Sequence, residues 1–262
     1  MSFLHAIIFG IVEGLTEFLP ISSTAHLELT QSMLGIATSD FIKSFQIAIQ
    51  SGAILSVVVL YFRKIFSSHR YLLNIFIAFV PTGVIGFLLY KVIKQFLLGN
   101  IALAAVALLL GGVVILIFER HQKKNIVVAN LPLDKKVEDL SVKELLYLGA
   151  IQALAVVPGV SRSGAVIIGG RMLGLPAGLI AEFSFVLAIP TMLAATFYDL
   201  FKSGFAFSSA DWNALLVGFI ISFAVALLSV KWLIGYVKRH TFEIFGWYRI
   251  VLGGLVLLLL IF

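Results

Sequence analysis

The hydrophobic positions of the chain gather into long runs, and these runs predict helices that cross a membrane. A helix needs about 20 mainly apolar residues to span the hydrocarbon core of a bilayer. The runs that meet or approach this length are 45–62, 71–90, 101–118, 178–198, 213–233 and 246–262. The pattern therefore predicts six membrane spans.

Two further apolar regions, 3–34 and 145–175, do not fit a simple span. Each is too long for one helix, and each is interrupted by proline and by polar residues. Irregular backbone at membrane depth is tolerated only where it is buried in protein or lines a cavity. We therefore predict that each region folds as a re-entrant helix–loop–helix.

The order of these segments repeats along the chain. Residues 1–118 hold a broken region and three spans, and residues 145–262 hold the same series, with Pro20 and Pro158 at matching places. Because each half crosses the membrane an odd number of times, the halves face opposite ways. We predict an all-α integral membrane protein built as an inverted repeat, a plan typical of transporters. Residues 119–144 are then a cytoplasmic linker loop.

Composition excludes a soluble enzyme, because 61% of the 262 residues are hydrophobic and only 12% are charged. Soluble domains have about 25% charged residues. In a membrane protein the net charge of +6 indicates basic cytoplasmic loops rather than a nucleic acid partner. Most Lys and Arg residues, Arg249 included, fall on one side when the spans are traced through the membrane. This bias predicts that both termini lie outside the cytoplasm.

Two carboxylates interrupt the first broken region. Glu13 and Glu17 are four residues apart, so they share one face of an otherwise apolar helix. Ionisable groups at membrane depth are costly, and by default they indicate a functional site. The pair can hold a hard divalent cation through its oxygens or work as acid and base. The alternative is a structural role in hydrogen bonds to Ser, Thr or Arg.

A helix start follows these carboxylates. Pro20 and the run Ser22-Ser23-Thr24 are residues that commonly mark a helix N-terminus, where a serine acts as the cap. The same end also offers free backbone N–H groups that suit a phosphate. Ser23 and His26 are three residues apart, so on a helix His26 can lie beside Ser23 and activate it as a nucleophile.

Arg162 lies at the break of the second region. An arginine there can snorkel toward an interface, but guanidinium also binds phosphate in bidentate fashion. Neighbouring serine and glycine residues can present backbone N–H groups to an anion. With the acidic break of the first half, Arg162 indicates a metal-assisted phosphate site. The expected phosphate-binding residues beside it are Ser22, Thr24, Ser161, Ser163, Gly164 and Gln50.

These motifs resemble the undecaprenyl-diphosphate phosphatase family of bacteria, of the bacitracin-resistance type. The resemblance rests on EGLTEFLPISST at 13–24 followed by His26, and on PGVSRSG at 158–164. It extends to Gln50 with 52–55, to 81–86, 182–185 and 188–190, and to Tyr248-Arg249. It therefore covers nearly the whole chain.

The resemblance implies a plasma-membrane enzyme that hydrolyses undecaprenyl diphosphate to the monophosphate carrier of cell-wall synthesis, with a site open to the outside. It implies that Glu13 and Glu17 are the essential acidic pair, used for a divalent metal (Mg²⁺ or Ca²⁺) or for proton transfer. Ser23 is then the favoured nucleophile, and His26 is its base or the rival nucleophile. Arg162 holds the diphosphate.

The chain departs from the family's usual pattern at three positions. Ala25 stands where the family usually has glycine, Val166 stands where threonine is frequent, and Glu28 replaces a residue that is usually apolar. None of these departures removes a central group of the expected site.

Two other functions fit parts of the pattern. A lipid-phosphate transporter or flippase would share the inverted repeat and would bind phosphate without hydrolysing it. A phosphatase of the unrelated acid-phosphatase type is disfavoured, because the spacings of its Lys, Arg and two His residues are not found. The expected partners are a polyprenyl diphosphate and bilayer lipids. A homodimer stays open.

Overall fold

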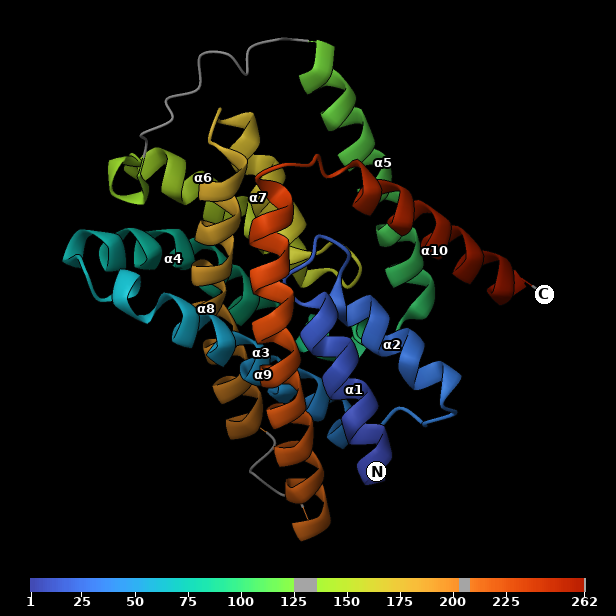
Figure 1. Ribbon diagram of the computed structural model, residues 1–262. Helices are drawn as coiled ribbons and strands as arrows, with labels where there is room; N and C mark the ends of the chain where they lie inside the picture. Colours follow the sequence, from blue (N-terminus) through green and yellow to red (C-terminus); the bar gives the residue numbers. More distant parts are fainter. Residues whose placement is uncertain (125–135, 203–207, 262) are drawn as a thin grey trace.

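A computed structural model of the chain (Figure 1) describes residues 1–124, 136–202 and 208–261. These residues form ten α-helices, and they contain no strand. The helices are α1 (Phe3–Thr16), α2 (Ser23–Met33), α3 (Asp40–Ile65), α4 (His69–Val92), α5 (Ile101–Lys124), α6 (Val142–Ala153), α7 (Arg162–Met172), α8 (Ala177–Lys202), α9 (Ser209–Val237) and α10 (Glu243–Ile261). A π-helical turn (Ile93–Leu97) extends α4, and 3-10 turns cover Val137–Asp139 and Leu154–Val156.

Serine caps set where several of these helices begin. The side chains of Ser39 and Ser68 accept backbone N–H groups at the starts of α3 and α4. Ser141 does the same for α6, where Glu144 bonds back to the cap and completes a capping box. Each such cap stabilises its helix by about 1 kcal/mol, so these starts follow from local sequence.

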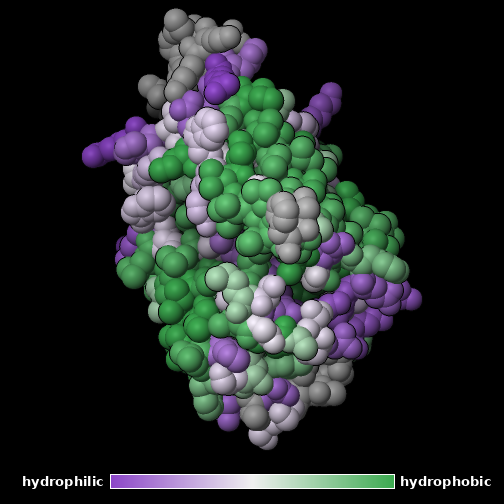
Figure 2. Space-filling view, turned by 90° about the vertical axis from the view of Figure 1, so that its right-hand side faces the viewer, coloured by the Kyte–Doolittle hydropathy of each residue, from purple (hydrophilic) through white to green (hydrophobic). Residues whose placement is uncertain are grey.

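Six helices are long and apolar enough to cross a membrane: α3, α4 with its π-helical turn, α5, α8, α9 and α10. They contain five of the predicted spans in full and residues 246–261 of the sixth, whose last residue lies outside the described residues. The prediction of an all-α protein with six long apolar helices is confirmed. Large apolar side chains stay exposed on them, including Phe87 (63%), Leu88 (71%) and Phe197 (67%). In Figure 2, apolar residues cover most of the visible face, and hydrophilic residues gather mainly toward its ends and one edge.

The two halves of the chain interlock through their short helices. α1 packs against α9, and α6 packs against α4, so each short helix rests on a long helix of the other half. Glycine allows both approaches: a Cβ on Gly14 would lie 2.7 Å from the carbonyl oxygen of Ser222, and one on Gly149 would lie 2.0 Å from that of Ala78. Small residues at such contacts are the usual basis of helix packing in membranes. α3 also packs against α8 and α9, and α5 packs against α10.

The polar segment 119–144 differs from the expected loop at both ends. α5 continues to Lys124, and Glu119 is buried, with its carboxylate accepting the backbone N–H of Phe242 at 3.1 Å. This contact, just before α10, gives Glu119 a partner inside the protein, which favours helix there over a solvated loop. α6 begins at Val142, inside the predicted linker. Residues 125–135 of the predicted linker lie outside the described residues.

Candidate functional site

The two broken regions turn in the same way. α2 begins directly after Ser22, and α7 begins directly after Ser161. These two serines have φ angles of 68° and 70°, and they are the only residues other than glycine with positive φ in the described part of the chain. Such a backbone conformation costs about 1–3 kcal/mol and persists only where the surroundings hold it in place. The contacts between the breaks supply that support.

Serine side chains join one break to the other. The Ser22 hydroxyl accepts the backbone N–H of Gly159 at 3.1 Å. In the opposite direction, Ser163 donates its hydroxyl proton to the carbonyl oxygen of Leu19 at 3.0 Å. Gly159 has φ of 93°, and a Cβ there would lie 2.3 Å from the carbonyl oxygen of Ala104. Only glycine therefore fits at this point of the second break.

Arg249 of α10 satisfies backbone carbonyls of both breaks at once. Its guanidinium donates to Pro20 at 3.0 Å in the first break, and to Gly159 at 2.7 Å and Val160 at 3.1 Å in the second. It also donates to two carbonyls of α5, those of Ala107 and Leu108. Sequence reasoning counted Arg249 among the residues beside cytoplasmic loops, but the structure buries it in the interior with 1% exposure. Its positive charge faces carbonyl dipoles there.

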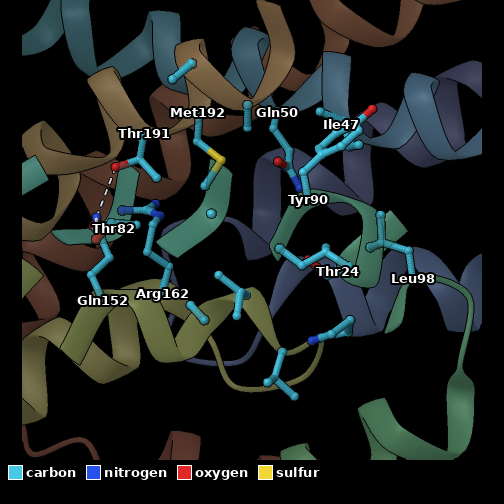
Figure 3. Close-up of a pocket in the computed structure, with 18 of the residues that line it drawn as sticks. Thr24, Ile47, Gln50, Thr82, Tyr90, Leu98, Gln152, Arg162, Thr191 and Met192 are labelled. Atoms are coloured by element: carbon cyan, nitrogen blue, oxygen red, sulfur yellow. Dashed lines mark hydrogen bonds between the residues drawn. The ribbon is translucent and has the colours of Figure 1, made fainter. Parts of the chain in front are cut away.

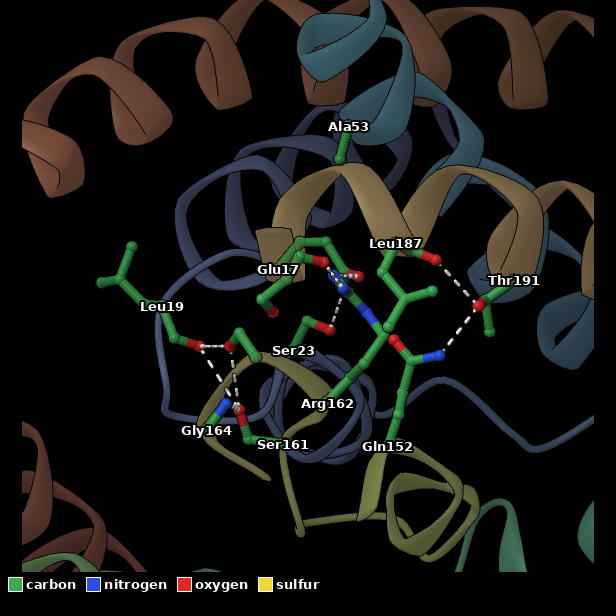
Figure 4. A network of polar contacts seen from close by, with 12 residues as sticks. Glu17, Leu19, Ser23, Ala53, Gln152, Ser161, Arg162, Gly164, Leu187 and Thr191 are labelled. Atoms are coloured by element: carbon green, nitrogen blue, oxygen red, sulfur yellow. Dashed lines mark hydrogen bonds and ion pairs between the residues drawn. The ribbon is translucent and has the colours of Figure 1, made fainter. Parts of the chain in front are cut away.

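Glu17 lies between Ser23 and Arg162 (Figure 4). One carboxylate oxygen, Oε2, accepts the Ser23 hydroxyl at 2.5 Å, and the other, Oε1, accepts Arg162 Nη2 at 3.1 Å. Arg162 Nη1 donates to the carbonyl oxygen of Ser184 at 2.8 Å. A buried ion pair is stable only when further hydrogen bonds satisfy its remaining groups. Here the Ser23 hydroxyl proton points at a carboxylate, which is the arrangement of a nucleophile with its base.

His26 bonds to Ser22 and Tyr248 rather than to Ser23. Its Nδ1 bonds the carbonyl oxygen of Ser22 at 2.7 Å, and its Nε2 bonds the hydroxyl of Tyr248 at 2.7 Å. The two rings also stack, with centroids 5.6 Å apart. Because a carbonyl oxygen only accepts, the proton is on Nδ1, and Nε2 accepts from Tyr248. The expected contact of His26 with Ser23 is therefore absent, because the ring is drawn back to the cap carbonyl and toward α10.

Glu13 lies one turn before Glu17 on α1, as the spacing predicts, but it is fully buried. Neither of its carboxylate oxygens has a hydrogen-bond partner in the described part of the chain. An unpaired buried carboxylate is costly. It requires a proton or a cation, and hard oxygen donors of this kind suit Mg²⁺ or Ca²⁺. The orphaned oxygens thus fit a cation shared with Glu17.

A cavity of about 640 Å³ opens from this site (Figure 3). Its polar end is formed by Glu17, Ser22, Ser23, Thr24, Ser161 and Arg162. The remaining wall comes largely from apolar residues of α4 and α8, among them Phe79, Val84, Phe87, Leu88, Met192 and Ala195. The cavity therefore joins a charged, hydrogen-bonding end to a mainly apolar channel.

The structure separates the other predicted phosphate residues into two groups. Ser22, Thr24, Ser161 and Gln50 line the cavity. Ser163 instead bonds the first break, and the Gly164 backbone N–H donates to Ser161 Oγ at 3.2 Å as part of the α7 cap. The three departures lie off the cavity wall: Ala25 and Val166 are buried among apolar residues, and Glu28 accepts the backbone N–H of Gly99 at 2.8 Å.

Sequence reasoning assigned no role to several polar residues that complete the site. Tyr248 positions His26, and Gln152 of α6 joins Thr82 of α4 to Thr191 of α8 on the cavity wall. A signal was present for Gln152, since it is a lone amide within an apolar stretch. Its partners could not be foreseen, because they come from two other helices, α4 and α8.

Comparison with known proteins gives consistent matches along the chain. The sequence model of the family described as bacitracin resistance protein BacA matches residues 6–255. An undecaprenyl-diphosphatase of Aquifex aeolicus is 50% identical over 249 residues, covering 95% of this chain and 95% of that protein. Proteins of the same name from Bdellovibrio bacteriovorus (47%, covering 99% and 97%) and Thermus thermophilus (45%, covering 95% and 94%) are similarly close.

Replacement of Arg249 by Met should destabilise the protein strongly. The change removes the donors of buried carbonyls in both breaks, and each buried acceptor left without a donor costs about 1–3 kcal/mol. We expect the free energy of unfolding in detergent to fall by at least about 3 kcal/mol. Lys231→Met, which removes an exposed cation from α9, is the matched control. Equal unfolding midpoints for the two variants would show that Arg249 does not support the breaks.

Proposed function

The chain belongs to the BacA family of bacitracin resistance proteins, and on this premise we propose that it hydrolyses undecaprenyl diphosphate to undecaprenyl phosphate and inorganic phosphate. The observation that carries the proposal is the Ser23 hydroxyl, which donates to Glu17 beside the Arg162 guanidinium. This group lies at the polar end of a mainly apolar cavity, and a lipid diphosphate has the same division into a charged end and an apolar chain. The reaction returns the lipid carrier to cell-wall synthesis and accounts for bacitracin resistance.

A lipid-phosphate transporter on the same fold is not favoured. The relatives that match nearly the whole chain are named as diphosphatases. Recognition of phosphate alone also gives no reason to hold a serine hydroxyl against a buried carboxylate.

The start of α2 is the best-supported seat for the terminal phosphate. Ser22, its cap residue, makes no side-chain hydrogen bond to the first turn, so the backbone N–H groups of that turn are left for an anion. At α7, by contrast, Ser161 caps the helix by accepting the N–H of Gly164. Ser22, Ser23 and Thr24 all line the cavity. The lipid chain would then lie along the apolar residues of α4 and α8.

From this seat, Ser23 Oγ attacks the terminal phosphorus while its proton passes to Glu17. The bond between that phosphorus and the bridging oxygen breaks, and the lipid monophosphate leaves with the proton that Glu17 returns. Water then attacks the phosphoserine, which restores the Ser23 hydroxyl and releases inorganic phosphate. Arg162 neutralises charge on the phosphoryl oxygens throughout. The contacts support Ser23 rather than His26 as nucleophile, because both ring nitrogens of His26 are already bonded.

A divalent cation, Mg²⁺ or Ca²⁺, completes the proposal. Glu13 and Glu17 would hold it, since Glu13 has two buried oxygens without partners in the described chain. Two carboxylates with phosphate oxygens of the substrate are a usual ligand set for such ions. When bound, the cation supplies positive charge that offsets the charge of the diphosphate.

We also propose that the halves are inverted repeats, each with a re-entrant helix pair, and that the site opens outside the cytoplasm. If α1–α5 correspond to α6–α10 in order, the contact of α1 with α9 corresponds to that of α6 with α4, as a two-fold relation requires. The cavity reaches Lys43 and Lys94, at the start of α3 and just beyond α4. The bias of basic residues places these helix ends, and both termini, outside.

Purified protein should release phosphate from undecaprenyl diphosphate in detergent when Mg²⁺ or Ca²⁺ is present. Because the cation is expected to offset substrate charge, a chelator should remove most of this activity, and added metal should restore it. Colorimetric phosphate assay measures both. Folded protein that binds the lipid but releases no phosphate would contradict the proposed function and favour the transporter.

Glu17→Gln and Ser23→Ala should each lower kcat by about 10²–10⁴-fold, the range expected for the loss of acid–base assistance. His26→Gln should lower it less, because His26 contacts Ser22 and Tyr248 rather than Ser23. Steady-state rates and thermal unfolding of all three variants check this. Retained turnover in Ser23→Ala together with its loss in His26→Gln would transfer the nucleophile's role away from Ser23.

The chain has no cysteine, so single cysteines can report the topology. Ser2→Cys should react with a membrane-impermeant maleimide in intact cells, and Ser67→Cys, exposed between α3 and α4, should react only after lysis. The reverse pattern would place the cavity mouth in the cytoplasm.

A further inference from the structure

A buried amide lies on the cavity wall and is not used by the proposed reaction. Gln152, in the last turn of α6, is 1% exposed and lines the cavity. Its Nε2 donates to the hydroxyls of Thr82 and Thr191, each at 3.0 Å (Figure 3). Each threonine follows a proline inside a long helix, Pro81 in α4 and Pro190 in α8.

The two threonines fix which way the amide points. Thr82 gives its own hydroxyl proton to the carbonyl oxygen of Gly149 at 2.7 Å, and Thr191 gives its proton to that of Leu187 at 3.0 Å. Both hydroxyls can therefore only accept from Gln152. A flipped amide would set two acceptors against its oxygen. The nitrogen thus faces the threonines, and the amide oxygen, Oε1, is held on the other side.

That oxygen and one nitrogen of Arg162 are both left without partners. Among the described residues, Gln152 Oε1 accepts no hydrogen bond, and Arg162 Nε donates none, although both atoms are buried. The other two nitrogens of Arg162 are bonded to Glu17 and to the Ser184 carbonyl. Both close-ups show the amide of Gln152 beside the side chain of Arg162 (Figures 3 and 4). The two neighbouring side chains therefore hold one unsatisfied acceptor and one unsatisfied donor.

We propose that Gln152 Oε1 and Arg162 Nε together bind one oxygen atom that carries a hydrogen. Such an oxygen accepts from Nε and donates to Oε1, whereas a fully deprotonated phosphate oxygen would be opposed by the amide oxygen's lone pairs. The chemistry fits the hydroxyl of a hydrogen phosphate group or a water molecule. The inference rests on the proposed function, and within it Gln152 determines which phosphate species the site accepts.

Few charged groups face this position. Glu17 and Arg162 are the charged residues beside it, and Glu13 lies behind Glu17 on α1. Thr82 of α4 and Ser184 and Thr191 of α8 also face it, and these residues do not titrate near neutral pH. Farther along the cavity lie Lys43, Tyr90, Lys94 and Tyr198. The neutral Gln152 amide is therefore the group that distinguishes an oxygen that carries a hydrogen from one that does not.

Inorganic phosphate and sulfate separate this role from general anion binding, because phosphate carries hydrogen at neutral pH and sulfate does not. Their inhibition constants are measured for conversion of radiolabelled undecaprenyl diphosphate by the wild-type protein and by Gln152→Met. We expect the variant to raise the constant for phosphate about tenfold and to leave that for sulfate within about twofold, since one hydrogen bond to a buried acceptor is lost. A kcat about tenfold lower, with KM and both inhibition constants unchanged, would identify the bound oxygen as water.

Gln31→Met is the matched control, since it removes a buried amide of α2 that does not line the cavity. If Gln152→Met leaves all constants within about twofold of wild type, or weakens phosphate and sulfate equally, the proposal is wrong. If that variant does not fold, the double variant Thr82→Val/Thr191→Val keeps Gln152 but frees its amide to rotate. It should shift the phosphate constant in the same direction and by less. An unchanged constant there, together with an unchanged kcat, would also overturn the proposal.

The outcome stays distinct from that of the proposed function. A wild-type protein without turnover would refute hydrolysis itself, whereas the tests on Gln152 compare variants of an active enzyme. Thermal stabilisation of the wild-type and Gln152→Met proteins by phosphate and by sulfate provides a readout that needs no turnover. A preference for phosphate that is equal in both proteins, together with an unchanged kcat, would refute the role of Gln152 alone.

Discussion

The structure depends on satisfying the backbone of two broken helices inside the protein interior. Buried peptide groups have no water to bond and need partners within the protein, so the two breaks satisfy each other. Ser22 takes an N–H from the second break, Ser163 gives a proton to the first, and Arg249 serves carbonyls of both. The catalytic geometry follows from this, because the same turns bring Ser23, at the start of α2, and Arg162, at the start of α7, to the same carboxylate.

The charged groups of the site are also arranged so that each has a partner or a place for one. Glu17 is buried, yet both of its oxygens accept hydrogen bonds, one from the Arg162 guanidinium and one from the Ser23 hydroxyl. Glu13 is buried without partners in the described chain, which leaves a place for a proton or a metal ion. Opposite them, the uncapped start of α2 and Arg162 favour an anion. The site is thus prepared for a diphosphate whose charge is offset from several directions, while the apolar walls of α4 and α8 accommodate its lipid.

Much of this architecture could be predicted from the sequence, because apolar runs and their interruptions are local signals. The six spans, the two breaks and the residues Glu17, Ser23 and Arg162 all come from such patterns. The orientation of His26 could not, since helical spacing brings it near Ser23 but the Ser22 carbonyl and Tyr248 determine its rotamer. The burial of Arg249 and the hydrogen bonds of Gln152 also could not be predicted, because their partners come from distant helices. The charge pattern predicts a loop at Glu119. In the structure Glu119 belongs to α5, and its carboxylate accepts the N–H group of Phe242.

A double-mutant cycle on kcat/KM measures whether Ser23 and Glu17 act as one unit. Residues that act together in one step are strongly non-additive. We expect Ser23→Ala/Glu17→Gln to be about as impaired as the worse single variant. Losses that multiply across these two positions, while Ser23→Ala and His26→Gln prove non-additive instead, would show that His26, and not Glu17, is the functional partner of Ser23.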